Sequence, residues 1–185
     1  HAGTTPMDQR RDALAAAAEL ILAVREIVRS APGRQVGTVG YVNAFPGATN
    51  VIAGRAEFPI ELRDLSGEKL AELAAQIRLR AQEIAQKENV RIEITEVETH
   101  ASALTDPNIR IHMQQACLEM RIPSLVIASG AGHDAQAMAR LCPIGMIFIP
   151  SRDGISHSPE EYSRPEDIAC GTELLYRTLL RLDRA

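Results

Sequence analysis

Two histidines in loops of the second half of the sequence are the side chains best suited to chemistry. His133 lies in a glycine-rich loop, SGAGHDA, which follows an apolar segment and precedes a predicted helix. His157 lies in the loop GISHSPEE, after the next apolar segment. In an α/β protein such loops meet at the carboxyl edge of the sheet, where ligands bind. The pattern therefore predicts a ligand site at these loops.

The imidazole of His157 is a candidate metal ligand, although the same loop allows a second interpretation. Zinc and related ions need about three protein ligands from His, Asp, Glu or Cys. Carboxylates surround His157, but no second histidine does. Taken alone, His157 is also consistent with a solvent-exposed side chain. His100 and His112 are isolated, and we predict that both lie on the surface.

The glycine loop around His133 allows three interpretations. Gly130, Gly132 and Ala135 satisfy the GxGxxA pattern of dinucleotide-binding loops, and Asp153 follows the next strand like a ribose-binding acid. Asp134 argues against this interpretation, because its carboxylate would repel a pyrophosphate. The glycines can instead let backbone N–H groups at a helix N-terminus approach a substrate oxygen. The third interpretation is a tight structural turn.

Asn50 and Arg63 lie on opposite sides of one predicted strand connection. The guanidinium group of arginine is a planar fork that matches a carboxylate, and an asparagine side chain can add a further donor. This pair could therefore bind an acidic ligand. The alternative for Arg63, which is flanked by acidic residues in ELRD, is a surface ion pair.

Composition excludes several classes of protein. The 185 residues are 45% apolar and 24% charged, with a formal net charge of −4 and no tryptophan. A negative chain with few aromatic side chains is poorly suited to nucleic acid, and no apolar run is long enough to span a membrane. Three cysteines without CxxC spacing predict buried free thiols in the reducing cytoplasm: Cys117, Cys142 and Cys170.

Hydrophobic periodicity predicts two different halves with a boundary near residue 103. In residues 1–103 we expect, in order, helix 7–30, strands 35–43 and 56–65, helix 66–87 and strand 90–97. One strand before His1 would complete a βαββαβ ferredoxin-like unit. That missing strand, and a start at His1 rather than Met, suggest a piece of a longer protein.

Residues 104–185 show the strand–helix alternation of part of a mixed α/β sheet. The predicted elements are helix 106–121, strand 124–128, helix 134–141, strand 145–149 and helix 165–183. The two strands are apolar throughout (SLVIA and GMIFI), which is typical of strands buried on both faces. Because two strands do not form a stable sheet alone, we expect the rest of this sheet elsewhere.

Five sequence segments occur in one order and carry a family resemblance: HAGTTPMDQRRDA, PGATNVIAG, FPIELRDL, SGAGHDA and MIFIPSRDGISHSPEE. Together they resemble the hydantoinase/carbamoylase branch of the M20 metallopeptidase superfamily, specifically its C-terminal half. The resemblance implies that residues 1–103 form a ferredoxin-like lid and dimerisation domain, which lacks its first strand. Residues 104–185 would then be the C-terminal part of a mixed α/β catalytic domain.

The resemblance also implies a role for each candidate residue of the lid. His1 of HAGTTPM matches the histidine that stabilises the oxyanion. Asn50 of ATNVIAG and Arg63 of ELRDL match the pair that grips the substrate carboxylate. In the family these lid groups reach the active site of the neighbouring subunit, so a homodimer is expected.

In the second domain the resemblance implies substrate-binding and metal-binding residues. Gly132 and His133 match a glycine loop that lines the substrate pocket, and His157 matches the last metal ligand. Two divalent ions are implied, zinc or else manganese, cobalt or nickel. The family's other ligands, and its general base, lie upstream of HAGTTPM and are absent from this chain.

The function implied by the resemblance is metal-dependent hydrolysis of the carbamoyl C–N bond of N-carbamoyl-L-amino acids. Metal-bound hydroxide would attack the carbamoyl carbon while His1 donates to the oxyanion. Allantoate amidohydrolase and β-ureidopropionase remain open, because all these substrates carry a ureido group and a carboxylate. A different class also remains open, namely a dimerising and substrate-binding module without activity of its own.

Overall fold

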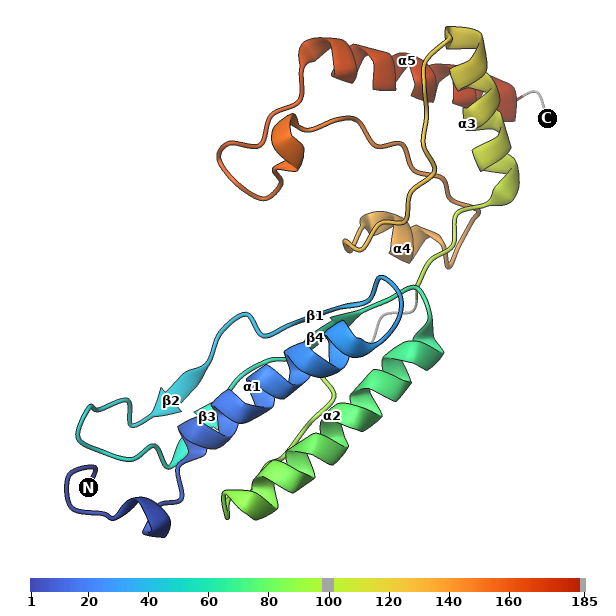
Figure 1. Ribbon diagram of the computed structural model, residues 1–185. Coiled ribbons are helices and arrows are strands. Elements are labelled where there is room, and N and C mark those ends of the chain that lie inside the picture. The colour runs from blue at the N-terminus through green and yellow to red at the C-terminus, as the bar shows by residue number, and fades with distance from the viewer. Residues whose placement is uncertain (98–101, 184–185) are drawn as a thin grey trace. The chain divides into compact units, whose positions relative to one another are not determined.

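Two compact units make up the chain, His1–Ser102 and Ala103–Ala185. The computed structural model describes residues 1–97 and 102–183 (Figure 1). Both units combine helices with extended chain, so the mixed α/β character predicted from the sequence is confirmed. In the part of the chain that is described, no helix is long and apolar enough to cross a membrane.

The first α-helix begins later than the sequence pattern predicts. Helix α1 spans Ala13–Ser30, and only a short 3-10 turn, η1 (Met7–Gln9), follows Pro6. The carboxylate of Asp12 accepts hydrogen bonds from the N–H groups of Leu14 and Ala15, at 3.0 and 3.2 Å. The predicted start at Met7 is therefore wrong, because Asp12 satisfies the first free N–H groups of the helix.

Each of the two long strands predicted for the first unit is divided into two short strands. The four strands are β1 (Val36–Thr38), β2 (Asn43–Phe45), β3 (Arg55–Glu57) and β4 (Glu61–Arg63). Strand β1 pairs antiparallel with β4, placing Gly37 opposite Leu62, and β2 pairs antiparallel with β3. Pro59 lies in the break between β3 and β4, because proline has no N–H to donate to a ladder.

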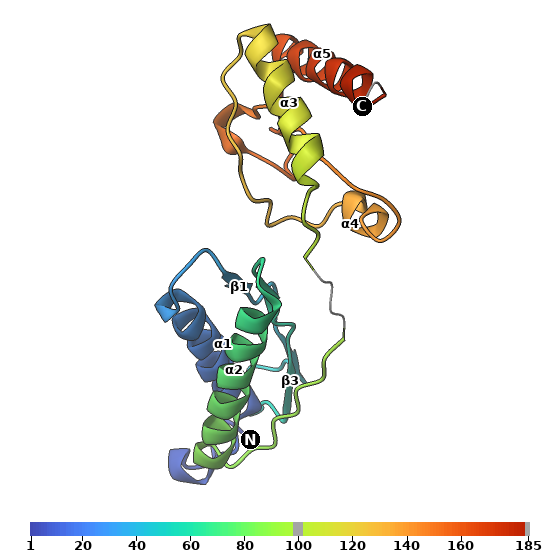
Figure 2. The ribbon, with the colours of Figure 1, turned by 90° about the vertical axis from the view of Figure 1, so that its right-hand side faces the viewer.

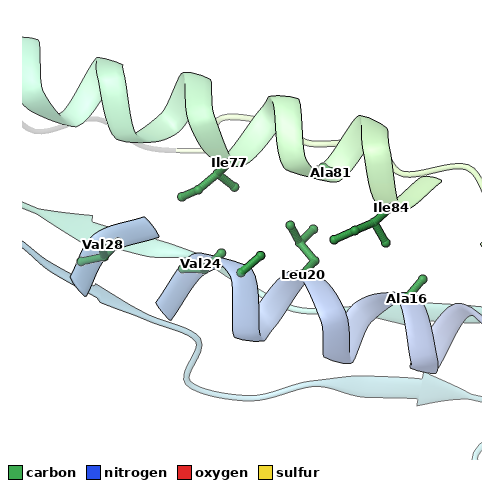
Figure 3. Close-up of a cluster of buried hydrophobic side chains, with 8 residues drawn as sticks. Ala16, Leu20, Val24, Val28, Ile77, Ala81 and Ile84 are labelled. Carbon is green, nitrogen blue, oxygen red and sulfur yellow. The ribbon is translucent and has the colours of Figure 1, made fainter. Parts of the chain in front are cut away.

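The core of the first unit lies between α1 and α2 (Gly67–Lys87), with the strands on one side of both helices (Figure 2). As predicted, α2 begins after Ser66, whose hydroxyl accepts from the N–H of Lys69. Figure 3 shows the interdigitating side chains, which include Leu20 and Val24 from α1 and Ile77 and Ile84 from α2. Each such buried side chain stabilises the unit by about 1.5–3 kcal/mol.

Residues 90–97, predicted as a strand, are extended but have no strand partner among the described residues. Val90 and Ile92 nevertheless pack against the core between the helices. The segment therefore has the apolar face of a strand without a backbone neighbour. A strand exists only when a second strand accepts and donates its backbone hydrogen bonds, and the βαββαβ interpretation places a further strand in this unit.

The second unit is built on two packed helices, α3 (Pro107–Met120) and α5 (Pro165–Leu182). Ala116 and Cys117 from α3 contact Leu174 from α5 in a small core. The predicted strands 124–128 and 145–149 are extended but unpaired within the described residues, and Leu125 is 84% exposed. The prediction of two formed strands is therefore wrong for this chain, since neither segment has a paired neighbour.

Shorter elements and several side chains of the second unit also differ from expectation. Helix α4 spans only Asp134–Met138, and a 3-10 turn, η2, spans Arg152–Gly154. Cys117 is buried as predicted, but Cys142 is exposed and Cys170 is half-buried. His112 is half-buried with its Nδ1 atom enclosed, so its predicted surface position is wrong. His100 lies outside the described residues.

Candidate functional site

His1, the predicted oxyanion donor, has one ring nitrogen occupied within its own loop. The backbone N–H of Gly3 donates to Nδ1 of His1 at 3.1 Å. In a neutral imidazole the accepting nitrogen carries no proton, so the proton lies on Nε2. Nε2–H is thus the donor that this exposed ring can offer to a ligand. A Cβ at Gly3 would lie 3.3 Å from Cε1 of His1, so this close approach favours glycine.

The backbone joins the loop of His1 to the loop of Asn50. The N–H of Ala2 donates to the carbonyl oxygen of Asn50 at 2.9 Å. Asn50 lies in the connection between β2 and β3, where its side chain is exposed. Two of the residues singled out in the sequence are therefore brought together by the fold, although 49 positions separate them.

Arg63, at the end of β4, takes part in the surface ion pair that its acidic neighbours suggested. Its Nε atom donates to Oε1 of Glu61 at 3.0 Å, and Nη2 approaches the same oxygen. The side chains of Arg63 and Glu61 are 42% and 59% exposed. Because water screens an ion pair this exposed, it contributes little to stability. A ligand carboxylate would have to compete with Glu61 for this guanidinium group.

The fold separates Asn50 from Arg63. The loop of Asn50 meets the start of α1, where the N–H of Ala13 donates to the carbonyl oxygen of Ala53. The β1–β4 pair meets the end of α1, since a Cβ at Gly37 would lie 2.6 Å from Val28. Ala13 and Val28 are 15 residues apart, or about 22 Å along a helix. Figure 1 shows the two strand pairs at opposite ends of α1, so the fold does not bring Asn50 and Arg63 of one chain together.

Local contacts in the glycine loop hold the ring of His133. Its Nε2 atom lies 2.8 Å from the hydroxyl oxygen of Ser129, which also accepts from the N–H of Ala131. The ring of Phe148 meets it edge-on, with centroids 5.7 Å apart. Gly132 directly precedes His133 and is exposed, so the backbone there is open to a ligand. Ser129 was not singled out from the sequence.

His157 lies on an exposed loop with a left-handed backbone, φ 58°. Its N–H donates to a carboxylate oxygen of Glu161 at 2.8 Å. The hydroxyl of Ser158 donates to Glu160, which lowers the pKa of that carboxyl from its ordinary value. The loop therefore carries negative charge next to the imidazole at neutral pH.

The described residues do not form a metal centre by themselves. Nowhere among them do three His, Cys, Asp or Glu side chains gather in a way that could hold an ion. His157 is then a single candidate ligand, fewer than the three that a catalytic site needs. A shallow cavity of about 450 Å³ lies between residues 104–107 and 139–144 of the second unit, and it includes none of the predicted site residues.

Comparison with known proteins gives the family context of these residues. The model of peptidase family M20/M25/M40 matches residues 2–181. An N-carbamoyl-L-amino acid amidohydrolase from Geobacillus stearothermophilus is 43% identical over 98% of the chain and 44% of the relative. A ureidoglycolate hydrolase from Arabidopsis thaliana is 40% identical over 98% of the chain and 39% of the relative. The chain thus spans less than half the length of these relatives.

A solved structure shows that the fold is shared as well. The crystal structure of a protein named AtUAH, in complex with glyoxylate, superposes with a TM-score of 0.92 at 39% identity. The match covers 100% of this chain and 44% of that one.

Proposed function

Because the chain belongs to peptidase family M20/M25/M40, we propose that it serves in an amidohydrolase that cleaves the carbamoyl C–N bond of N-carbamoyl-L-amino acids. The observation that carries this proposal is the hydrogen bond from Gly3 to His1. It places the proton of a neutral imidazole on Nε2, and an N–H donor of this kind is what an oxyanion requires. The relatives whose names specify N-carbamoyl-L-amino acids support the choice of substrate.

His1 would act when the carbamoyl carbon becomes tetrahedral. At that moment the carbonyl oxygen takes up negative charge, and the Nε2–H of His1 donates to it. A single donor of this kind is worth about 3–4 kcal/mol in the transition state. Asn50, joined to the His1 loop through Ala2, would present its side-chain amide to the same substrate.

Arg63 would bind the carboxylate of the N-carbamoyl-L-amino acid substrate. Since the fold does not bring Arg63 and Asn50 of one chain together, we propose that the first unit is the lid of a homodimer. Each active site would then receive Asn50 and His1 from one subunit and Arg63 from the other. This arrangement differs from the expectation that all lid groups of one chain reach a single neighbouring site.

The second unit would contribute the substrate loop and a metal ligand of the catalytic domain. Gly132 and His133 would line the pocket, and Ser129 would orient the His133 ring. His157 would be one ligand of a divalent metal centre that also needs ligands from outside this chain.

Ureidoglycolate is the second candidate substrate, favoured by the 40% identity to a ureidoglycolate hydrolase. A substrate panel on the complete enzyme decides between them. It should contain several N-carbamoyl-L-amino acids, ureidoglycolate, allantoate and dipeptides, with ammonia and amine release both measured. The proposal predicts the highest kcat/KM for an N-carbamoyl-L-amino acid. Hydrolysis of dipeptides without hydrolysis of any ureido compound would contradict it, as would binding without turnover.

A further inference from the structure

Arg10 is a half-buried cation that binds backbone rather than acid. It lies between η1 and α1, and no ion pair of its guanidinium group is found within residues 1–97 and 102–183. Its Nε atom donates to the carbonyl oxygen of Thr5 at 3.0 Å, and its Nη2 atom donates to the carbonyl oxygen of Ala2. A charged donor on a neutral carbonyl forms a stronger hydrogen bond than a neutral donor does.

The two carbonyl groups that Arg10 binds belong to the two ends of the His1 loop. Ala2 directly follows His1 and is the residue bonded to Asn50. Thr5 closes the loop, because its N–H and its hydroxyl donate to the carbonyl oxygen of His1, at 3.2 and 2.9 Å. One guanidinium group therefore spans the loop, and only its planar fork can reach both oxygens at once.

We propose that Arg10 is a positioning residue for His1, which sets the direction of its Nε2–H through the backbone of residues 1–5. The inference rests on the proposed oxyanion role of His1. Without Arg10 the loop keeps its sequence and its glycine, but the histidine loses a fixed direction. Donors must lie within about 0.5 Å of the productive position, so a loosely held ring loses most of its effect.

The consequence is a loss in kcat rather than in substrate binding. In the complete enzyme, Arg10→Met should lower kcat by about ten-fold or more while KM changes less than about two-fold. The kcat of Arg10→Lys should lie between those of the wild type and Arg10→Met, since an ammonium group reaches one carbonyl oxygen but not both. Arg11→Met is the matched control, because Arg11 is the exposed neighbour of the same charge, and it should leave kcat unchanged.

A double-mutant cycle with His1→Gln tests the coupling itself. If Arg10 acts through His1, adding Arg10→Met to His1→Gln should lower kcat little further. Full additivity would overturn the proposal, and so would a wild-type kcat in Arg10→Met. If His1→Gln alone leaves kcat intact, the oxyanion role fails instead, which separates the two failures.

Structure and activity can also be separated. Hydrogen exchange of the backbone amides in residues 1–6 should be faster in Arg10→Met than in Arg11→Met. The two variants should nevertheless have the same Tm, which would show that only the loop, and not the whole fold, is loosened. If Arg10→Met does not fold, Arg10→Lys decides, and a wild-type kcat in that variant contradicts the proposal.

Discussion

The N–H of Ala2 donates to the carbonyl oxygen of Asn50 at 2.9 Å, which joins the loop after His1 to the loop between β2 and β3. The two loops come from distant parts of the sequence, yet they share one end of α1. Any substrate that receives a hydrogen bond from His1 is therefore also near Asn50. By contrast, Arg63 lies toward the other end of the same helix (Figure 1), which is why the proposed function assigns it to a second active site.

Loss of the His1 imidazole should affect the chemical step. In the complete enzyme, His1→Ala should lower kcat by about 100-fold or more, as the loss of one oxyanion donor does, with a smaller change in KM. Steady-state kinetics on an N-carbamoyl-L-amino acid measure both constants. Thr4→Ala, an exposed side chain in the same loop, is the control. A near-normal kcat in His1→Ala would exclude the proposed role.

Loss of Arg63 should affect binding of the substrate carboxylate. Arg63→Ala should raise KM about ten-fold or more, because a hydrogen bond to a charged group contributes about 1.5–3 kcal/mol. Arg55→Ala is the matched control, since Arg55 also pairs with a glutamate two positions away, Glu57, and it should leave KM unchanged. The KM for a substrate whose carboxylate is replaced by a carboxamide should not depend on Arg63. Equal effects on both substrates would show that Arg63 does not bind the carboxylate.

Mixed dimers test whether Asn50 and Arg63 of one chain serve different active sites. Asn50→Ala and Arg63→Ala enzymes are unfolded together, refolded at equal amounts and assayed at a substrate concentration well below KM, where loss of either substrate-binding side chain should remove most of the activity. In a mixed dimer one site has both native residues and the other has neither, so random mixing should restore about a quarter of wild-type activity. Refolding each variant alone is the control. No recovery after mixing would mean that one chain supplies both residues to the same site.

Metal content tests His157. In the complete enzyme, His157→Ala should lose bound metal and activity together, because a catalytic ion normally has only about three protein ligands. Elemental analysis after dialysis measures the metal, and Ser158→Ala in the same loop is the control. Retained metal together with full activity would remove His157 from the ligand set.

Features that depend on neighbouring residues, such as helix starts, could be predicted from the sequence more completely than the pairing of strands or the distances between site residues. The start of α2 after Ser66 follows from a single capping residue, and α3 follows from Asp106 and the proline after it. Residues 90–97 look like a strand because their side chains alternate, but pairing depends on a neighbour that the alternation does not reveal. The same limit applies to the apolar segments of the second unit.

The candidate site shows the same division. The residue types at His1, Asn50 and Arg63 pointed to their chemistry. However, a spacing of 13 positions in the sequence does not reveal that Asn50 and Arg63 lie toward opposite ends of α1. Arg10 was missed because its partners are backbone carbonyl groups, which leave no mark in a sequence. Asp8 and Asp12 lie within two positions of Arg10 in the sequence, so its charge pattern suggests a surface ion pair and gives no sign of the two backbone contacts.

The length of α1 has a consequence for how such an enzyme can change. Because the loop of Asn50 and the strand of Arg63 lie toward the two ends of α1, its 18 residues would set the spacing between the two active sites of the proposed dimer. Loop substitutions can alter which substrate fits without altering that spacing. An insertion of one helical turn would move the two ends apart by about 5.4 Å in both subunits at once. In the proposed dimer, a change in substrate choice would therefore leave this spacing intact, whereas a change in the length of the helix would not.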